Sequence, residues 1–190
     1  MIKRWPLLLC LLLAACAQPL APRTADTLGS AAIAPDQPFV NARAIIIVRH
    51  ANIDVTQKNN ATPLLPAGVE RAKGLIPALQ DAGITRIVVS PALRTQQTAA
   101  ALAEALKIKP DEGPAGGNDV VQYLADTAKP DQTILLVHHH SAIPSILQGF
   151  GFAHESQAVD ATEFDRAYLL LPNAQTRTYQ LLRLRYGGTW

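Results

Sequence analysis

The sequence predicts an α/β domain in which a doubly wound, mostly parallel sheet is flanked by helices. Three apolar runs, 45–48, 84–89 and 133–137, have the near-continuous hydrophobicity of strands that are buried on both faces. Helical patterns separate these runs, and this alternation is typical of a parallel sheet with helices on both sides. The 190 residues leave room for one such domain and a tail.

The other elements follow from capping and turn signals. Ser90 and Pro91 favour a helix start, because Ser can cap the first N–H groups and Pro fits the first helical position. Alternating apolar residues predict two late antiparallel strands, 164–171 and 176–185, joined by a turn at 172–173. The expected helices are 66–82, 91–106, 118–128 and 141–148.

The first residues have the features of an export signal. Lys3 and Arg4 precede an apolar run, 6–15, that is far shorter than the roughly 20 residues of a membrane-spanning helix. The run ends in Leu13-Ala14-Ala15-Cys16, which resembles the lipobox of bacterial lipoproteins. This resemblance implies cleavage after residue 15, a lipid on Cys16 and a domain held on the periplasmic side of a membrane. Ala rather than Asp at position 17 resembles the enterobacterial sorting signal for the outer membrane, which favours the outer membrane over the inner one. An ordinary signal peptide or a membrane anchor is the alternative.

Residues 16–42 are rich in Ala and Pro and show little periodicity, so we expect a flexible tether between the lipid and a domain over 43–190. Within the tether, an arm packed on the domain remains an alternative for residues 33–40. Cys10 lies in the export signal and Cys16 is the lipid site, which leaves the mature domain without a thiol for a disulfide.

The charge of the chain argues against nucleic acid as a partner. The net charge is +2, but removal of residues 1–15 takes away Lys3 and Arg4 and none of the 15 acidic residues. The mature chain is therefore neutral, and a basic surface of the kind that binds polyanions is not expected.

Polar residues follow each of the three buried strands. Arg49 and His50 follow the first strand, Arg94 lies on the helix after the second, and three histidines at 138–140 follow the third. Ligands of open α/β folds bind at the carboxyl ends of the strands. If the strands are neighbours, imidazole and guanidinium groups converge on one pocket, and such a cationic, donor-rich pocket suits a phosphoryl group.

Four segments of the chain resemble the histidine phosphatase superfamily, which includes the phosphoglycerate mutases. The resemblance covers residues 44–171 and implies a phosphoglycerate mutase-like fold. Its carriers are the strand 45–48 with Arg49-His50-Ala51, the segment 63–68 (PLLPAG), the segment 90–99 (SPALRTQQTA) and the element 135–144, which contains the strand, the histidines and Ile-Pro.

The resemblance implies a role for each matching residue. His50 would be the nucleophile that forms a phosphohistidine, with its second nitrogen protonated and held by an acceptor, for which we expect a backbone carbonyl. Arg49, Arg94 and a second histidine would bind the non-bridging phosphoryl oxygens. No metal and no cofactor would be required.

The second histidine is assigned by register. In the family pattern it lies two residues after the last apolar strand residue and five before the proline, which selects His139. His138 then replaces a small residue, and His140 either contacts the edge of the phosphate or faces solvent. A metal cluster is the rival interpretation, but consecutive side chains on a strand alternate faces and cannot all reach one ion.

A general acid is the least defined part of the predicted site. Many members of the family carry a Glu in a long insertion after the helix that contains Arg94, and here the insertion is nearly absent. Glu112 occupies the place that resembles the acid of compact phosphohistidine phosphatases. Asp111 competes with it, and a solvated loop carboxylate is the alternative for both.

These observations predict a metal-independent phosphatase that hydrolyses a phosphomonoester or a phosphoramidate through a phosphohistidine on His50. The short insertion implies an open pocket, which disfavours a mutase because transfer to a second substrate needs a closed site. Expected partners are a phosphorylated substrate and, through Cys16, a membrane. The alternative is a non-catalytic envelope lipoprotein that binds phosphate or a phosphorylated protein.

Overall fold

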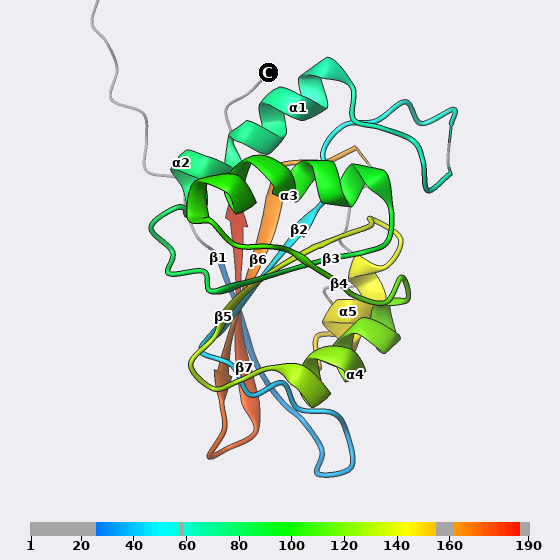
Figure 1. Cartoon of the computed structure of the whole chain (residues 1–190). Coiled ribbons are helices and arrows are strands. Elements are labelled where there is room, and N and C mark those ends of the chain that lie inside the picture. Colours follow the sequence, from blue (N-terminus) through cyan, green and yellow to red (C-terminus); the bar gives the residue numbers. More distant parts are fainter. Residues whose placement is uncertain (1–25, 58, 155–161, 187–190) are drawn as a thin grey trace, which may run out of the picture.

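A computed structural model describes residues 26–57, 59–154 and 162–186. Its centre is a seven-stranded sheet with the order β1-β7-β6-β2-β5-β3-β4 (Figure 1). Neighbours from β2 to β4 run parallel, whereas β1, β7, β6 and β2 are joined by antiparallel pairing. The strands are β1 (Asp26–Ala32), β2 (Ala44–Arg49), β3 (Arg86–Val89), β4 (Asp111–Glu112), β5 (Thr133–His138), β6 (Arg166–Asn173) and β7 (Thr178–Arg185).

Helices cover both faces of the sheet, as Figure 1 shows. One face carries α1 to α3 and the other α4 and α5. The helices are α1 (Pro66–Lys73), α2 (Leu75–Leu79), α3 (Leu93–Leu106), α4 (Gly117–Thr127) and α5 (Ile143–Gly149). The predicted fold class, an α/β sheet of the phosphoglycerate mutase-like kind with helices on both sides, is confirmed. Its antiparallel part is larger than expected because β1 adds to the late strands.

The run of apolar residues in β2 is explained by burial of both faces of the strand, as the sequence predicted. Ile45 and Ile47 pack with α4 and α5, while Ile46 and Val48 pack with α2 and α3. All four side chains are buried, and each contributes about 1.5–3 kcal/mol relative to an exposed position. A strand that is covered on both faces therefore has no polar position until it ends, at Arg49 and His50.

Some element boundaries differ from the predictions. The predicted helix 66–82 is two helices separated at Gly74, and β6 continues through Pro172 and Asn173, so the turn comes later. The helix start at Ser90 and Pro91 is also wrong. Helix α3 begins at Leu93 after Ala92, with no side-chain cap, because the Ser90 hydroxyl is bonded elsewhere.

The predicted tether is wrong for residues 26–42. Strand β1 pairs with β7 at the edge of the sheet, and Ile33, Val40 and Ala42 are buried in the core. The backbone N–H of Val40 donates to the Tyr179 hydroxyl. The open edge of β7 offers backbone partners that a composition-based interpretation cannot see. The packed arm considered for 33–40 is the better description, whereas residues 1–25, including Cys16, lie outside the described residues.

The described helices are all too short or too polar to cross a membrane.

Candidate functional site

The three predicted strand ends meet at one edge of the sheet. Strand β5 lies between β2 and β3, so the residues that follow these strands are neighbours. Backbone hydrogen bonds carry this arrangement past the strand ends: the N–H of His50 donates to the His138 carbonyl, and the N–H of Ser90 donates to the Val137 carbonyl. A cavity of about 330 Å³ opens there, lined by Arg49, His50, Ile53, Val55, Arg94, His139, His140 and Ser141.

The His50 ring is held with one nitrogen free to react. Its Nδ1 donates to the carbonyl of Ala51 at 2.8 Å, which is the backbone acceptor that the sequence led us to expect. The N–H of Ala51 in turn donates to the Thr98 hydroxyl on α3. Burial, followed by the nearby Arg49 and Arg94 guanidiniums, lowers the pKa of His50 to about 4. At neutral pH the ring is therefore uncharged, with its lone pair on Nε2.

Arg94 reaches the cavity from the first turn of α3. Its Nη1 donates to the carbonyl of Asn59 at 2.7 Å, and its Nη2 donates to Nδ1 of His139 at 3.2 Å. Among the described residues its buried Nε has no hydrogen-bond partner. The guanidinium is thus held by one contact at each terminal nitrogen, and a planar group so fixed can offer its remaining N–H groups to an anion.

Arg49 is oriented by residues far away in the sequence. Its guanidinium carbon lies 3.7 Å from the centre of the Phe164 ring, and its Nη1 donates to the Glu163 carbonyl at 3.1 Å. Arg49 is only 8% exposed, so these contacts act in a poorly solvated setting. The sequence carried no signal for this role of Phe164, which was predicted only as the first residue of the late strand 164–171 and lies just before β6.

His139 faces His50 across the cavity. The two ring centres lie 5.6 Å apart, close enough for both rings to contact one tetrahedral anion. Nε2 of His139 is bonded to the Ser90 hydroxyl at 2.8 Å. Burial, and then the Arg94 charge, lowers the pKa of His139 to about 3. The histidine chosen by register thus lies in the cavity wall opposite His50.

The other two members of the histidine triplet have different positions. His138 is fully buried, and its Nε2 donates to the Pro114 carbonyl at 3.1 Å. His140 lines the cavity together with Ser141. In the parts of the chain that the structure describes, no three His, Cys, Asp or Glu side chains are grouped so as to hold a metal ion.

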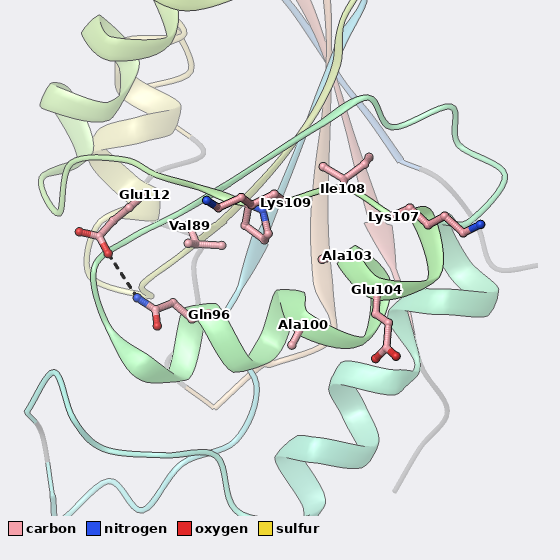
Figure 2. A pocket seen from close by; sticks show the side chains of 10 residues that line it. Val89, Gln96, Ala100, Ala103, Glu104, Lys107, Ile108, Lys109 and Glu112 are labelled. Atoms are coloured by element: carbon pink, nitrogen blue, oxygen red, sulfur yellow. Dashed lines mark hydrogen bonds between the residues drawn. The ribbon is translucent and has the colours of Figure 1, made fainter.

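The structure does not bring the predicted acids to the cavity. Strand β4 carries Asp111 and Glu112 and lies three positions from β2 in the sheet, which separates their backbones by roughly 14 Å. Asp111 accepts a hydrogen bond from Arg86 at 2.8 Å. Glu112 accepts one from Gln96 of α3 at 3.3 Å and lines a second cavity beside that helix (Figure 2). Strand order, which the sequence did not reveal, decides this outcome.

The buried histidines predict a pH-dependent stability. Burial lowers the pKa values of His50, His138 and His139 below the ordinary value of 6.5. Between pH 6.5 and about 4 the unfolded chain binds protons that the folded chain does not, so the free energy of unfolding falls as the pH falls. Urea titrations at two pH values in this window and at pH 7.5 measure the effect. His138→Gln should flatten the dependence and the exposed His154→Gln should not; equal stability at all three pH values would contradict the prediction.

Comparisons with known proteins point to the same residues that line the cavity. The sequence model of the histidine phosphatase superfamily (branch 1) matches residues 45–115, which include Arg49, His50 and Arg94. No curated protein sequence matches the chain.

Solved structures resemble the fold at low sequence identity. A protein described as the phosphohistidine phosphatase SixA from Agrobacterium tumefaciens is 17% identical, with a TM-score of 0.59 over 77% of this chain and 99% of that one. The protein histidine phosphatase SixA complexed with tungstate is also 17% identical, with a TM-score of 0.60 over 75% and 96%. A protein described as an α-ribazole-5'-P phosphatase from Escherichia coli K-12 is 17% identical, with a TM-score of 0.57 over 79% and 100%. The chain is thus similar to the histidine phosphatase superfamily over residues 45–115, and it shares the fold of these solved phosphatases.

Proposed function

We propose that the protein is a phosphatase that hydrolyses its substrate through a phosphohistidine on His50. The observation that carries the proposal is the neutral His50 ring, held at Nδ1 by Ala51, in a cavity that also contains Arg49, Arg94 and His139. A neutral imidazole can attack phosphorus, whereas an imidazolium has no lone pair to offer. The two guanidiniums supply fixed positive charge where the phosphoryl oxygens would lie.

The reaction divides into two displacements at phosphorus. In the first, Nε2 of His50 forms a bond to phosphorus while the bond from phosphorus to the leaving oxygen or nitrogen breaks. In the second, water attacks the phosphohistidine, the N–P bond breaks and inorganic phosphate leaves. The proton lost by water balances the proton taken up by the leaving group, so His50 returns to its starting neutral state. Arg49 and Arg94 would bind the non-bridging oxygens in both steps.

The structural neighbours support both substrate classes suggested by the sequence. The structural neighbours named above include a protein described as acting on phosphohistidine, a phosphoramidate, and one described as acting on a phosphomonoester. The cavity mouth carries Ile53 and Val55, and Val55 is 57% exposed. An open mouth with an apolar side supports access by phosphoryl groups on larger molecules as well as small ones.

The test combines turnover with capture of the intermediate. Purified protein is incubated with p-nitrophenyl phosphate, with and without EDTA and vanadate, and a rapid acid-free quench follows ³²P transfer from a labelled phosphodonor. We expect release that resists EDTA and is inhibited by vanadate, with an acid-labile label on His50. Release abolished by EDTA would favour a metal mechanism instead. Phosphate binding without any turnover would favour the non-catalytic binder.

Glu112→Gln is expected to leave turnover nearly unchanged. The carboxylate contacts Gln96 and lines the cavity of Figure 2 rather than the one that contains His50. The change in kcat/KM should stay within about twofold, which corresponds to the 0.5 kcal/mol typical of substitutions away from special features. Steady-state kinetics on p-nitrophenyl phosphate and on an alkyl phosphate measure it. A selective loss on the alkyl phosphate, whose leaving group most needs a proton, would restore Glu112 as the general acid.

We also propose that a lipid on Cys16 tethers the domain to the periplasmic side of a bacterial membrane, with the outer membrane favoured. The support is the lipobox-like sequence Leu13-Ala14-Ala15-Cys16. The nine residues between Cys16 and Asp26 would allow a reach of at most roughly 30 Å. Cys16→Ser should move the protein from the membrane fraction to the soluble periplasmic fraction and abolish incorporation of labelled palmitate. Retention in the membrane fraction would point to a different anchor.

A further inference from the structure

We propose that Ser90 and Thr95 are positioning residues that keep the ring proton of His139 on Nε2, so that binding of a phosphoryl-like dianion requires Nδ1 of His139 to take up a proton. The inference rests on the proposed function, since it assumes that the cavity takes a phosphoryl group. It adds two residues that contribute no atom to the cavity wall, and it makes anion binding depend on pH.

The contact with Arg94 places the ring lone pair of His139 on Nδ1. Nη2 of Arg94 lies 3.2 Å from Nδ1 of His139. A guanidinium has only N–H donors and no acceptor. Nδ1 must therefore accept this hydrogen bond and carry no proton. In a neutral ring the single proton is then on Nε2.

Two buried hydroxyl groups continue the hydrogen-bond series that begins at Nε2 of His139. Nε2–H of His139 donates to the Ser90 hydroxyl oxygen at 2.8 Å. The Ser90 hydroxyl lies 3.0 Å from that of Thr95, and the Thr95 hydroxyl lies 2.8 Å and 2.7 Å from the carbonyls of Ser90 and Ala92. Carbonyls only accept, so the Thr95 hydrogen points to them and the Ser90 hydrogen points to Thr95. Each hydrogen bond in this series therefore has one donor direction, from His139 through Ser90 to Thr95 and the two carbonyls.

The form of His139 with its proton on Nδ1 is unfavourable. Ser90 and Thr95 are completely buried, so water does not compete for their hydroxyl groups. A proton on Nδ1 in place of Nε2 would require the Ser90 hydrogen to turn toward His139 and leave Thr95. It would also set an N–H of Arg94 against an N–H of His139. Buried donors that lose their acceptors are unfavourable, which makes the Nε2–H form the stable one.

A bound dianion would favour protonation of Nδ1 of His139. The charged and titratable groups that act on His139 are Arg94 on α3, Arg49 and His50 at the end of β2, and His138 on β5, and His140 lines the same cavity beside it. The four groups named first all oppose a positive charge on the ring. A dianion reverses the local charge, and its oxygens would be repelled by a bare lone pair on Nδ1. A proton taken from solvent turns that repulsion into a charge-assisted N–H···O hydrogen bond and returns to solvent when the anion leaves.

The experiment uses tungstate, a tetrahedral dianion that carries no proton near pH 7. Calorimetric titrations in two buffers with different ionisation enthalpies count the protons taken up. We expect about one or more protons per tungstate, because Nε2 of His50 also faces the anion. Long-range ¹H–¹⁵N spectra of the histidine rings assign the site. Nδ1 of His139 should be unprotonated in the free protein and protonated in the complex.

Matched variants test the two positioning residues. Thr95→Ser keeps the hydroxyl and should keep the wild-type spectrum and proton count. Thr95→Val and Ser90→Ala weaken the acceptor for Nε2–H and leave Arg94 alone to hold the lone pair on Nδ1. A fraction of free His139 should then carry its proton on Nδ1, with less proton uptake on tungstate binding. Ser145→Ala, which removes a hydroxyl that donates to the Ala142 carbonyl at 3.0 Å, is the control and should change neither. Ser90→Ala serves as the test if Thr95→Val does not fold.

The outcomes separate this inference from the proposed function. Tungstate binding to wild type with no change at Nδ1 of His139, or a protonated Nδ1 in the free protein, would overturn the inference and leave the phosphatase proposal standing. Failure of wild type to bind tungstate would overturn the proposed function, and with it the uptake of a proton. Proton uptake without turnover would uphold the inference in a protein that only binds.

Discussion

His50→Asn is expected to abolish phosphate release while leaving the fold intact. Nε2 of His50 is the only attacking atom in the proposed reaction, and the amide of Asn has no comparable nucleophile. Loss of a member of a catalytic set lowers kcat by about 10⁴–10⁶-fold. Asn is chosen because its side chain can still donate toward the Ala51 carbonyl, which His50 contacts at 2.8 Å. Turnover of p-nitrophenyl phosphate and labelling of the intermediate measure the effect.

His154→Asn is the matched control, since His154 lies exposed in a loop outside the cavity. Its rate and its label should equal those of wild type. Tungstate affinity of His50→Asn should persist, because Arg49, Arg94 and His139 remain. Turnover by His50→Asn near the wild-type rate, or a label on another residue, would refute the nucleophile assignment. A circular dichroism spectrum unlike that of wild type would require a second variant, His50→Gln, for the same comparison.

Arg94→Ala is expected to produce the second largest loss. Arg94 brings fixed charge to the cavity and donates to Nδ1 of His139, so its removal affects both the phosphoryl oxygens and the second histidine. Loss of one such donor lowers kcat by about 10²–10³-fold. Arg94→Lys should recover little, because an ammonium group cannot bind the Asn59 carbonyl and an anion through one planar fork. Measurement of kcat, KM and the vanadate inhibition constant separates binding from chemistry.

Arg43→Ala provides the control for charge. Arg43 is exposed and precedes β2, at the end of that strand opposite Arg49 and His50. Its removal changes the net charge by the same amount without altering the cavity. We expect wild-type kinetics for Arg43→Ala and raised vanadate inhibition constants for both Arg94 variants. Equal, small effects of the Arg43 and Arg94 substitutions would mean that only the overall charge matters and that Arg94 does not contact the substrate.

The cavity residues recovered from the sequence share a local property. Arg49, His50, Arg94 and His139 each follow a buried strand directly or lie on the first turn of the next helix. Parallel strands place their carboxyl ends at one edge, so these residues converge because β2, β5 and β3 are neighbours in the sheet. The position of Glu112 relative to the cavity could not be predicted in this way. It depends on the distance between strands across the sheet rather than on a position along one strand.

The residues that orient the cavity could not be predicted in this way. Phe164 and Glu163 contact Arg49 from a segment 114 or more residues further along the chain. Ser90 resembled a helix cap in the sequence, yet its hydroxyl is used by His139 and Thr95. A side chain with several possible partners takes the one that burial leaves available, and burial is a property of the assembled domain.

Hydrophobic patterning by itself predicted the α/β class and the strand that carries Arg49 and His50, because these depend on residues adjacent in the chain. Only the tertiary structure decided the strand order, which sets Glu112 apart from His50, and the pairing of β1 with β7, which turns residues 26–42 from tether into domain. The physical reason is the same in both cases. Which strand edge meets which partner depends on the burial gained by the whole sheet, and no local run of residues encodes that sum.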